Sequence, residues 1–206
     1  MLTYSVSLLM TAVFSITGVL AAARKSMDLF SIIVIGMVTA LGGGTVRDIL
    51  MDTPVFWLHK TVYLWVALGA AIATFWGARL FNSTYRLLLY LDALGVALFS
   101  VQALSKALAL KFSIPVAIVM SVLTGIGGGL IRDILTDRQT LLMSRELYAT
   151  PIMLGCTLYG VMLVLLPNFA FNHWIGFMTI FGLRAAAISW KLCMPNWLTY
   201  RDGTNG

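Results

Sequence analysis

The sequence has very little charge for its length. Only 11% of its 206 residues are Asp, Glu, Lys or Arg, whereas 60% are hydrophobic, and the mean hydropathy is +0.91. Soluble domains carry about 25% charged residues, so a water-soluble globular protein is excluded. Uncharged stretches of about 20 residues recur along the chain, and this is the length that crosses the hydrocarbon core as a helix. The composition therefore predicts an all-α integral membrane protein.

Residues that carry metal or catalytic chemistry are also scarce. The chain has two cysteines, Cys156 and Cys193, and two histidines, His59 and His173, none at metal-ligand spacing. A glycine-rich stretch lacks the last glycine of a G-x-G-x-x-G nucleotide loop, because Leu130 stands there, and no βαβ context surrounds it. We therefore expect no enzyme, no metal site and no cofactor other than permeating ions.

Seven apolar stretches are long enough to be transmembrane helices. They lie at about residues 2–22, 28–50, 62–80, 86–104, 113–135, 147–166 and 173–191. The connections are short, so residues 1–206 are expected to form a single membrane domain with a short polar C-terminal tail, "YRDGTNG". The first basic residue, Arg24, follows the first stretch, which therefore lacks the basic start of a cleaved signal peptide and is expected to remain.

Lysine and arginine set the expected orientation. With the N-terminus outside, nine of the 14 basic residues fall in cytoplasmic loops and the tail, four fall outside, and Arg184 lies within the last span. This bias favours a multi-pass protein of the cell (inner or plasma) membrane with its N-terminus outside and its C-terminus cytoplasmic. Basic loops that face anionic lipid account for the net charge of +6, so no nucleic-acid partner is expected.

The sequence contains an internal repeat. "GGGTVRDIL" at residues 42–50 returns as "GGGLIRDIL" at residues 127–135, an offset of 85, and "TGVL" at 17–20 matches "LGVA" at 94–97, an offset of 77. Two three-span units are expected, at about 2–80 and 86–166, followed by a final helix at about 173–191. Because three is odd, the second unit enters the membrane from the opposite side. The result is an inverted repeat, which is typical of transport proteins.

Each unit carries a glycine triplet inside its second span. Gly42–Gly44 and Gly127–Gly129 are expected to interrupt the helices and to approach each other at the centre of the protomer. Carbonyl groups freed at this depth are tolerated only where protein or water satisfies them, which favours a pore or a binding site. The alternative is that the small residues merely allow close helix packing.

An arginine and an aspartate follow each triplet, Arg47 with Asp48 and Arg132 with Asp133. Neighbouring residues on a helix point about 100° apart, so we expect each arginine to pair with a carboxylate elsewhere and to act as a pore or gating charge. Asp92 is a further candidate, because an intramembrane acid usually faces a cavity or a basic partner.

The alternatives to a pore or gating role for these charges are helix-end solvation and simple ion pairing. Asp48 and Asp52, like Asp133 and Asp137, stand four residues apart on one expected helical face. They either present carboxylates to cations at each mouth or only solvate the helix ends. Asp92 either serves a site or pairs with Arg86 or another basic residue at the inner edge.

Three segments together resemble a known family: "TALGGGTVRDIL…PVFW", "LDALGVALFSVQ" and "TGIGGGLIRDIL". They are similar to the prokaryotic branch of the trimeric intracellular cation channels, which overlaps bacterial membrane proteins described as glycine transporters. The resemblance implies seven helices as two inverted three-helix repeats plus a seventh, a homotrimer, and a pore in each protomer for K⁺ and, less selectively, Na⁺. Gly42–Gly44 and Gly127–Gly129 would kink the second and fifth helices along that pore. The lysine-rich lipid motif of animal members has no match in "TDRQTLLMSRE".

Two other function classes remain. An alternating-access carrier for glycine or another small amino acid would use the same architecture, with a half-helix N-terminus near the glycines for the carboxylate and Asp92 for the amine. A non-transporting scaffold would leave the repeated glycine triplets unexplained.

Overall fold

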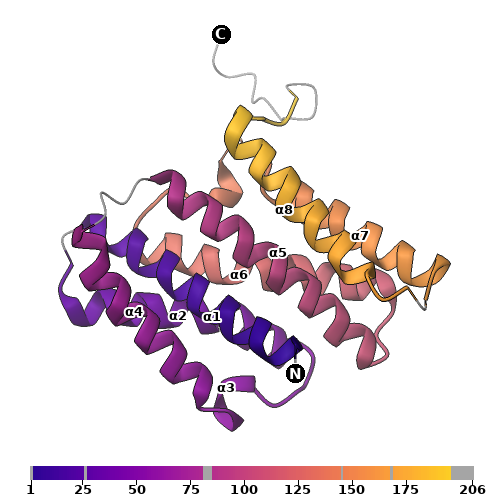
Figure 1. Ribbon diagram of the computed structural model, residues 1–206, viewed down its shortest axis with the longest axis horizontal. Coiled ribbons are helices and arrows are strands. Elements are labelled where there is room, and N and C mark those ends of the chain that lie inside the picture. The colour runs from indigo at the N-terminus through magenta and orange to yellow at the C-terminus, as the bar shows by residue number, and fades with distance from the viewer. Residues whose placement is uncertain (1, 26, 81–84, 145, 168, 196–206) are drawn as a thin grey trace, which may run out of the picture.

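The computed structural model describes residues 2–25, 27–80, 85–144, 146–167 and 169–195, so the polar tail at 200–206 lies outside the described residues. Within these ranges the chain is helical (Figure 1). The α-helices are α1 (Leu2–Ala22), α2 (Leu29–Leu50), α3 (Phe56–His59), α4 (Val62–Leu80), α5 (Tyr85–Ala109), α6 (Ile114–Leu135), α7 (Ala149–Leu165) and α8 (Asn172–Trp190).

Long helices occupy all seven stretches that the sequence predicts. The described ranges contain an eighth α-helix, α3, but its four residues are too few to cross a membrane, so the expected count of seven transmembrane helices stays a prediction. Two short 3₁₀ helices, Ala23–Lys25 and Leu141–Met143, lie in connections. Helix α5 also continues five residues past its expected end, to Ala109.

The outer surfaces are those of a membrane protein. Helices α1, α2, α5 and α6 are long and apolar enough to cross a bilayer, and α4 and α7 contain shorter apolar helical segments. Large apolar side chains are widely exposed, among them Phe30 at 76%, Trp65 at 69% and Trp190 at 73%. Water would penalise such surfaces, whereas lipid does not.

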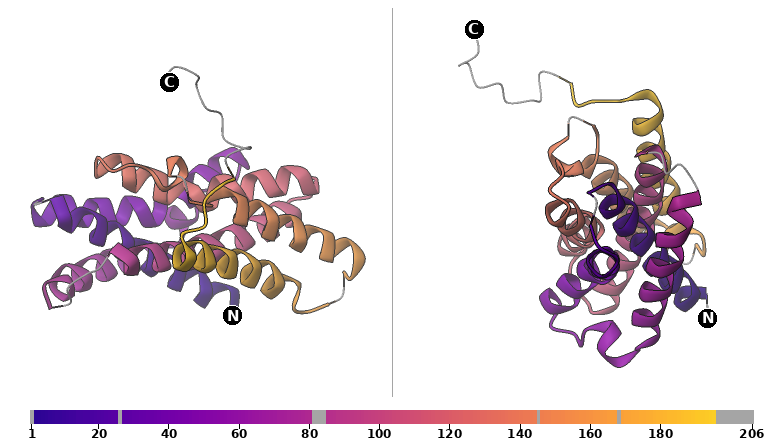
Figure 2. Two further views of the ribbon diagram at one scale, coloured as in Figure 1. Left: turned by 90° about the horizontal axis from the view of Figure 1, so that it is seen from above. Right: turned by 90° about the vertical axis from the view of Figure 1, so that its left-hand side faces the viewer.

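Helices α1, α2, α5 and α6 form the centre of the bundle (Figures 1 and 2). Helix α2 packs against α1 and α6, and α5 packs against the same two helices. Helix α4 covers α1 and α2, α7 lies against α6, and α8 packs against α5 and α7. The first three long helices therefore meet the next three along three contacts: α2 with α6, α1 with α5 and, less extensively, α1 with α6.

Helices α2 and α6 end in the same way. Asp52 and Asp137 follow them with φ angles of 50° and 46°, the left-handed conformation that commonly terminates helices. The expectation that they share a helical face with Asp48 and Asp133 was wrong, because the chain has already left the helix. Both side chains are exposed at the surface.

Neither glycine triplet interrupts its helix. Helix α2 runs continuously through Gly42–Gly44 and α6 through Gly127–Gly129, so the expected breaks are absent. Neighbouring side chains and the facing helix backbone occupy the space that the missing side chains leave.

The interior is unusually polar for an apolar chain. Six charged side chains are at most 5% exposed. Burying a charge is costly unless it is paired and hydrogen-bonded, so these residues mark the part of the molecule that needs a functional explanation. They are Arg47, Asp48, Asp92, Arg132, Asp133 and Arg184.

Candidate functional site

Helices α2 and α6 touch backbone to backbone at their glycines. A Cβ atom on Gly43 would lie 2.6 Å from the carbonyl oxygen of Thr124. A Cβ atom on Gly128 would lie 2.5 Å from the carbonyl oxygen of Thr39. The two contacts are reciprocal, since Gly128 lies 85 positions after Gly43 and Thr124 lies 85 positions after Thr39. The expectation that the two triplets approach each other is confirmed, and close packing explains their middle glycines.

Two phenylalanines close the space beside this glycine crossing. The rings of Phe14 (α1) and Phe99 (α5) meet edge to face with centroids 5.0 Å apart. Phe14 also lies against α6, where a Cβ atom on Gly128 would come 3.3 Å from its ring. The gap that remains has no room for a water molecule. The centre of the bundle is therefore shut. The gap is lined by Phe14, Thr39, Ala40, Gly43, Gly44, Phe99, Thr124 and Gly128.

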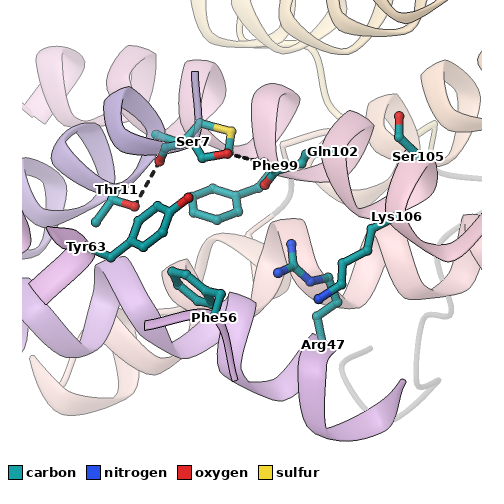
Figure 3. Close-up of a pocket in the computed structure, with 10 residues that line it drawn as sticks. Ser7, Thr11, Arg47, Phe56, Tyr63, Phe99, Gln102, Ser105 and Lys106 are labelled. Atoms are coloured by element: carbon teal, nitrogen blue, oxygen red, sulfur yellow. Dashed lines mark hydrogen bonds between the residues drawn. The ribbon is translucent and has the colours of Figure 1, made fainter. Parts of the chain in front are cut away.

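A cavity of about 330 Å³, here called the Arg47 vestibule, opens on one side of the crossing (Figure 3). Phe99 borders both the vestibule and the closed gap. The hydroxyl groups of Ser7 and Thr11 lie at one end of the vestibule, and Arg47 and Lys106 lie at the other with Ser105 nearby; aromatic rings lie between the two ends (Figure 3). The vestibule is lined by Ser7, Met10, Thr11, Arg47, Phe56, Tyr63, Phe99, Gln102, Ser105 and Lys106.

One carboxylate holds both vestibule cations. Arg47 Nε and Nη2 lie 2.7 Å from Asp48 Oδ1, and Lys106 Nζ lies 2.8 Å from the same oxygen. Asp48 Oδ2 accepts a 3.0 Å hydrogen bond from the backbone N–H of Phe56. The carboxylate of Asp48 is fully buried. Its contacts join the end of α2 to the start of α3 and to α5.

The second unit repeats this arrangement with one change. Arg132 Nε donates to Asp133 Oδ1 at 2.9 Å, and the Leu141 N–H donates to Asp133 Oδ2 at 3.1 Å. Arg132 Nη1 also binds Asp92 Oδ1 at 2.7 Å. Helix α5 thus supplies a lysine to the first arginine–aspartate pair and an acid to the second.

The sequence prediction for the arginines was therefore partly wrong. Both Arg47 and Arg132 bind the aspartate beside them, because a long guanidinium side chain can bend back at a helix end to a neighbouring carboxylate. Arg132 in addition has the expected partner on another helix, Asp92. This pairing identifies Arg132, and not Arg86, as the cation beside Asp92, while a site role for Asp92 stays a prediction.

A buried polar cluster surrounds Gly129. A Cβ atom there would lie 3.0 Å from the Tyr148 hydroxyl and 3.2 Å from Asp92 Oδ1. Within the described residues the Tyr148 hydroxyl, Asp92 Oδ2 and Arg132 Nη2 have no hydrogen-bond partner. The Arg184 guanidinium lies 4.6 Å from the centre of the Tyr148 ring. The last helix therefore touches the Arg132 site, and Gly129 leaves room for its polar groups.

The remaining aspartate candidates lie away from the vestibule. The exposed Asp137 carboxylate is 3.3 Å from Lys25 Nζ, and Asp52 is exposed beyond the end of α2. Neither belongs to the vestibule lining. Their positions match helix-end solvation better than cation binding.

Sequence reasoning missed Lys106, Phe14 and Tyr148. Lys106 lies two residues beyond residue 104, the expected end of its span, although α5 continues past it. Its spacing of 14 residues from Asp92 is close to four helical turns, which places both on one face of a single helix. That spacing was a usable signal, whereas nothing in the local sequence marks Phe14.

Comparison with known proteins places the chain among membrane proteins. A family model described as glycine transporter matches residues 4–79 and again residues 89–163. A UPF0126 membrane protein of Vibrio cholerae is 37% identical over 94% of this chain and 82% of its own length. The UPF0126 inner membrane protein YadS of Escherichia coli K12 is 36% identical over 98% of this chain and 100% of its own length.

The fold also matches a solved ion channel. The trimeric intracellular cation (TRIC) channel orthologue from Rhodobacter sphaeroides has a TM-score of 0.88 to this chain at 36% sequence identity. The match covers 93% of this chain and 99% of the channel chain. Likeness therefore extends over nearly the whole of both proteins.

Proposed function

Because the chain belongs to the glycine transporter family and shares its fold with prokaryotic TRIC channels, we propose that it is a membrane channel for monovalent cations. Each protomer of a homotrimer contains its own pore, which passes K⁺ and, less selectively, Na⁺. The chain forms one membrane domain in the inner or plasma membrane, with the N-terminus outside and the C-terminus in the cytoplasm.

The proposal includes two inverted three-helix repeats followed by a final helix. The family model matches the chain twice, at residues 4–79 and 89–163. Contacts recur at the same offset of 85, since Asp48 binds the N–H of Phe56 as Asp133 binds that of Leu141. These recurrences support equivalent roles for the two glycine triplets and the two arginine–aspartate pairs.

The observation that carries the proposal is the Arg47 vestibule. This cavity of about 330 Å³ is lined by charged and hydroxyl-bearing side chains as well as by aromatic rings, and Phe99 separates it from the closed gap at the glycine crossing. The buried Asp92–Arg132 pair lies next to Gly129, on the same helix as the crossing glycine Gly128. A path that joins the two sites has to pass Phe14 and Phe99, whose rings close it in this conformation.

Opening requires a change at the crossing. Glycines lower the resistance of α2 and α6 to bending, because they contribute no side-chain packing and have the lowest helix propensity apart from proline. We propose that bending at Gly42–Gly44 and Gly127–Gly129 separates the crossing from the Phe14 ring. Arg47, Asp48, Arg132, Asp133 and Asp92 then act as the charges along the path.

Thiol labelling in liposomes tests whether ions pass through the vestibule. Ser105 lines the vestibule, so Ser105→Cys in a Cys193→Ser background should lose K⁺ flux after treatment with a membrane-impermeant methanethiosulfonate. Lys111→Cys is the matched control, because Lys111 is exposed two residues beyond the end of α5. Labelling of Ser105→Cys that leaves K⁺ flux unchanged would remove the vestibule from the path.

A further inference from the structure

The Arg47 vestibule has more positive than negative charge. Arg47 and Lys106 both line it, and among the lining residues that the structure describes none is acidic. Their shared partner Asp48 is fully buried and supplies a single negative charge. The three side chains together therefore carry a net charge of +1 at the wall of a cavity within the membrane-spanning bundle.

The two cations lie close together. Arg47 Nη2 and Lys106 Nζ lie within 2.8 Å of one oxygen atom, Asp48 Oδ1, and Figure 3 shows their charged ends side by side at the vestibule wall. Like charges repel at this separation, and a surrounding of low polarity strengthens the repulsion. An additional negative charge beside them would relieve it.

Both cations have hydrogen-bond donors left over. Arg47 Nη1 makes no hydrogen bond with any residue that the structure describes, although it can donate two. Lys106 Nζ uses two of its three protons, on Asp48 at 2.8 Å and on Thr53 Oγ1 at 3.2 Å. The unused donors belong to residues that line the vestibule.

We propose that the Arg47 vestibule binds one small monovalent anion, a halide or a small carboxylate, between Arg47 and Lys106. One negative charge balances the excess of one positive charge. The volume of about 330 Å³ exceeds the roughly 30 Å³ that a water molecule occupies in the liquid, so an anion fits together with several waters. Phe56 and Phe99 form apolar walls, which disfavour strongly hydrated polyanions.

The anion site itself is inferred from these charges. Only its effect on K⁺ conduction rests on the proposed function. In a cation channel the bound anion neutralises the vestibule, so that K⁺ meets no net positive charge before the glycine crossing. Binding is measured without any ion flux. A failure of the anion site and a failure of cation conduction are therefore separate results.

Thermal unfolding of the detergent-purified protein tests the site. Chloride or acetate replaces lactobionate, a bulky disaccharide carboxylate, at constant K⁺ concentration. A ligand that binds only the folded state raises the unfolding midpoint in a saturable manner. We expect Lys106→Met to weaken the apparent affinity by at least about tenfold, since it removes one of the two cations. Lys60→Met, which removes an exposed lysine outside the vestibule, should retain the affinity of the parent.

Chloride and acetate together distinguish the kind of anion that the vestibule binds. A shift with both identifies a general monovalent site, whereas a shift with acetate alone or chloride alone identifies a carboxylate or a halide site. The absence of a saturable shift with either, or unchanged affinity in Lys106→Met, would overturn the proposal. A second readout needs no variant, because chloride and acetate must compete in the unmodified protein. Fully additive midpoint shifts at saturation would also overturn it.

Discussion

Gly43 packs so closely against Thr124 that a Cβ atom would come within 2.6 Å of the Thr124 carbonyl oxygen. The glycine therefore permits two helix backbones to touch, and its first role is steric. The contact joins α2 to α6 beside the point where the Arg47 vestibule ends. A triplet that resembles a helix breaker is thus part of an unbroken helix and of the closed centre of the bundle.

Alanine at either middle glycine should destabilise the protein. Gly43→Ala and Gly128→Ala each force a methyl group onto a backbone carbonyl, and such overpacking costs about 1–3 kcal/mol. The higher helix propensity of alanine offsets about 1 kcal/mol of this. Gly69→Ala is the control, because a Cβ atom on that helix glycine meets nothing within 4 Å. Thermal unfolding in detergent should rank both variants below the control, and equal midpoints would contradict the steric role.

Removing the Phe14 ring should open the path. Phe14→Ala deletes one of the two rings that close the gap beside the glycine crossing, so K⁺ flux into liposomes is expected to rise severalfold. Phe30→Ala, a change at a side chain that is 76% exposed, should leave the flux at the parent level. If Phe14→Ala folds and passes no more K⁺ than Phe30→Ala, the closed gap is not the barrier.

The two arginines should differ in their effect on stability. Arg132→Gln removes the cation that pairs with Asp92 among the described residues and also removes the ion pair of Asp133, so a loss of about 3–5 kcal/mol is expected. Arg47→Gln should cost less, because Asp48 retains Lys106 at 2.8 Å. Denaturation of the purified variants measures both losses.

A double variant controls for this interpretation. If the loss in Arg132→Gln comes from an uncompensated carboxylate, neutralising that carboxylate with Asp92→Asn should restore part of the stability. Equal losses in Arg47→Gln and Arg132→Gln, with no restoration by Asp92→Asn, would contradict the claim that an unpaired buried carboxylate causes the loss of stability.

The protein should assemble as a trimer. Its exposed apolar surfaces provide ample area for contact between copies, and its structural relative is a trimeric channel. Mass measurement of the particle, corrected for bound lipid or detergent, should give three times the chain mass of 22.5 kDa. A particle with the mass of one chain would rule out the homotrimer.

Sequence patterns predicted the long helices and the internal repeat, because each depends on residues that are close together in the sequence or on a repeated motif. Seven apolar stretches recur as long helices, and the offset of 85 predicted that Gly43 and Gly128 occupy related positions. The spacing of Asp92 and Lys106, which places both on one face of α5, is a further local signal that the sequence analysis did not use.

Details that depend on side-chain reach or on tertiary packing were not predictable in the same way. Helical angles alone suggested that Arg47 points away from Asp48, although its flexible side chain brings the guanidinium back to that carboxylate. The role of Phe14 depends on α1 lying beside α6 and α5, which no local pattern encodes. Whether glycines break a helix or join two helices is likewise decided by the neighbouring element.

Recording from the purified protein in planar bilayers tests the central claim most directly. With unequal KCl concentrations on the two sides, the account predicts discrete unitary currents that reverse close to the K⁺ equilibrium potential, and more frequent openings in Phe14→Ala. The absence of unitary currents, together with saturable uptake of glycine into liposomes that contain the same protein, would contradict a cation channel and identify a carrier.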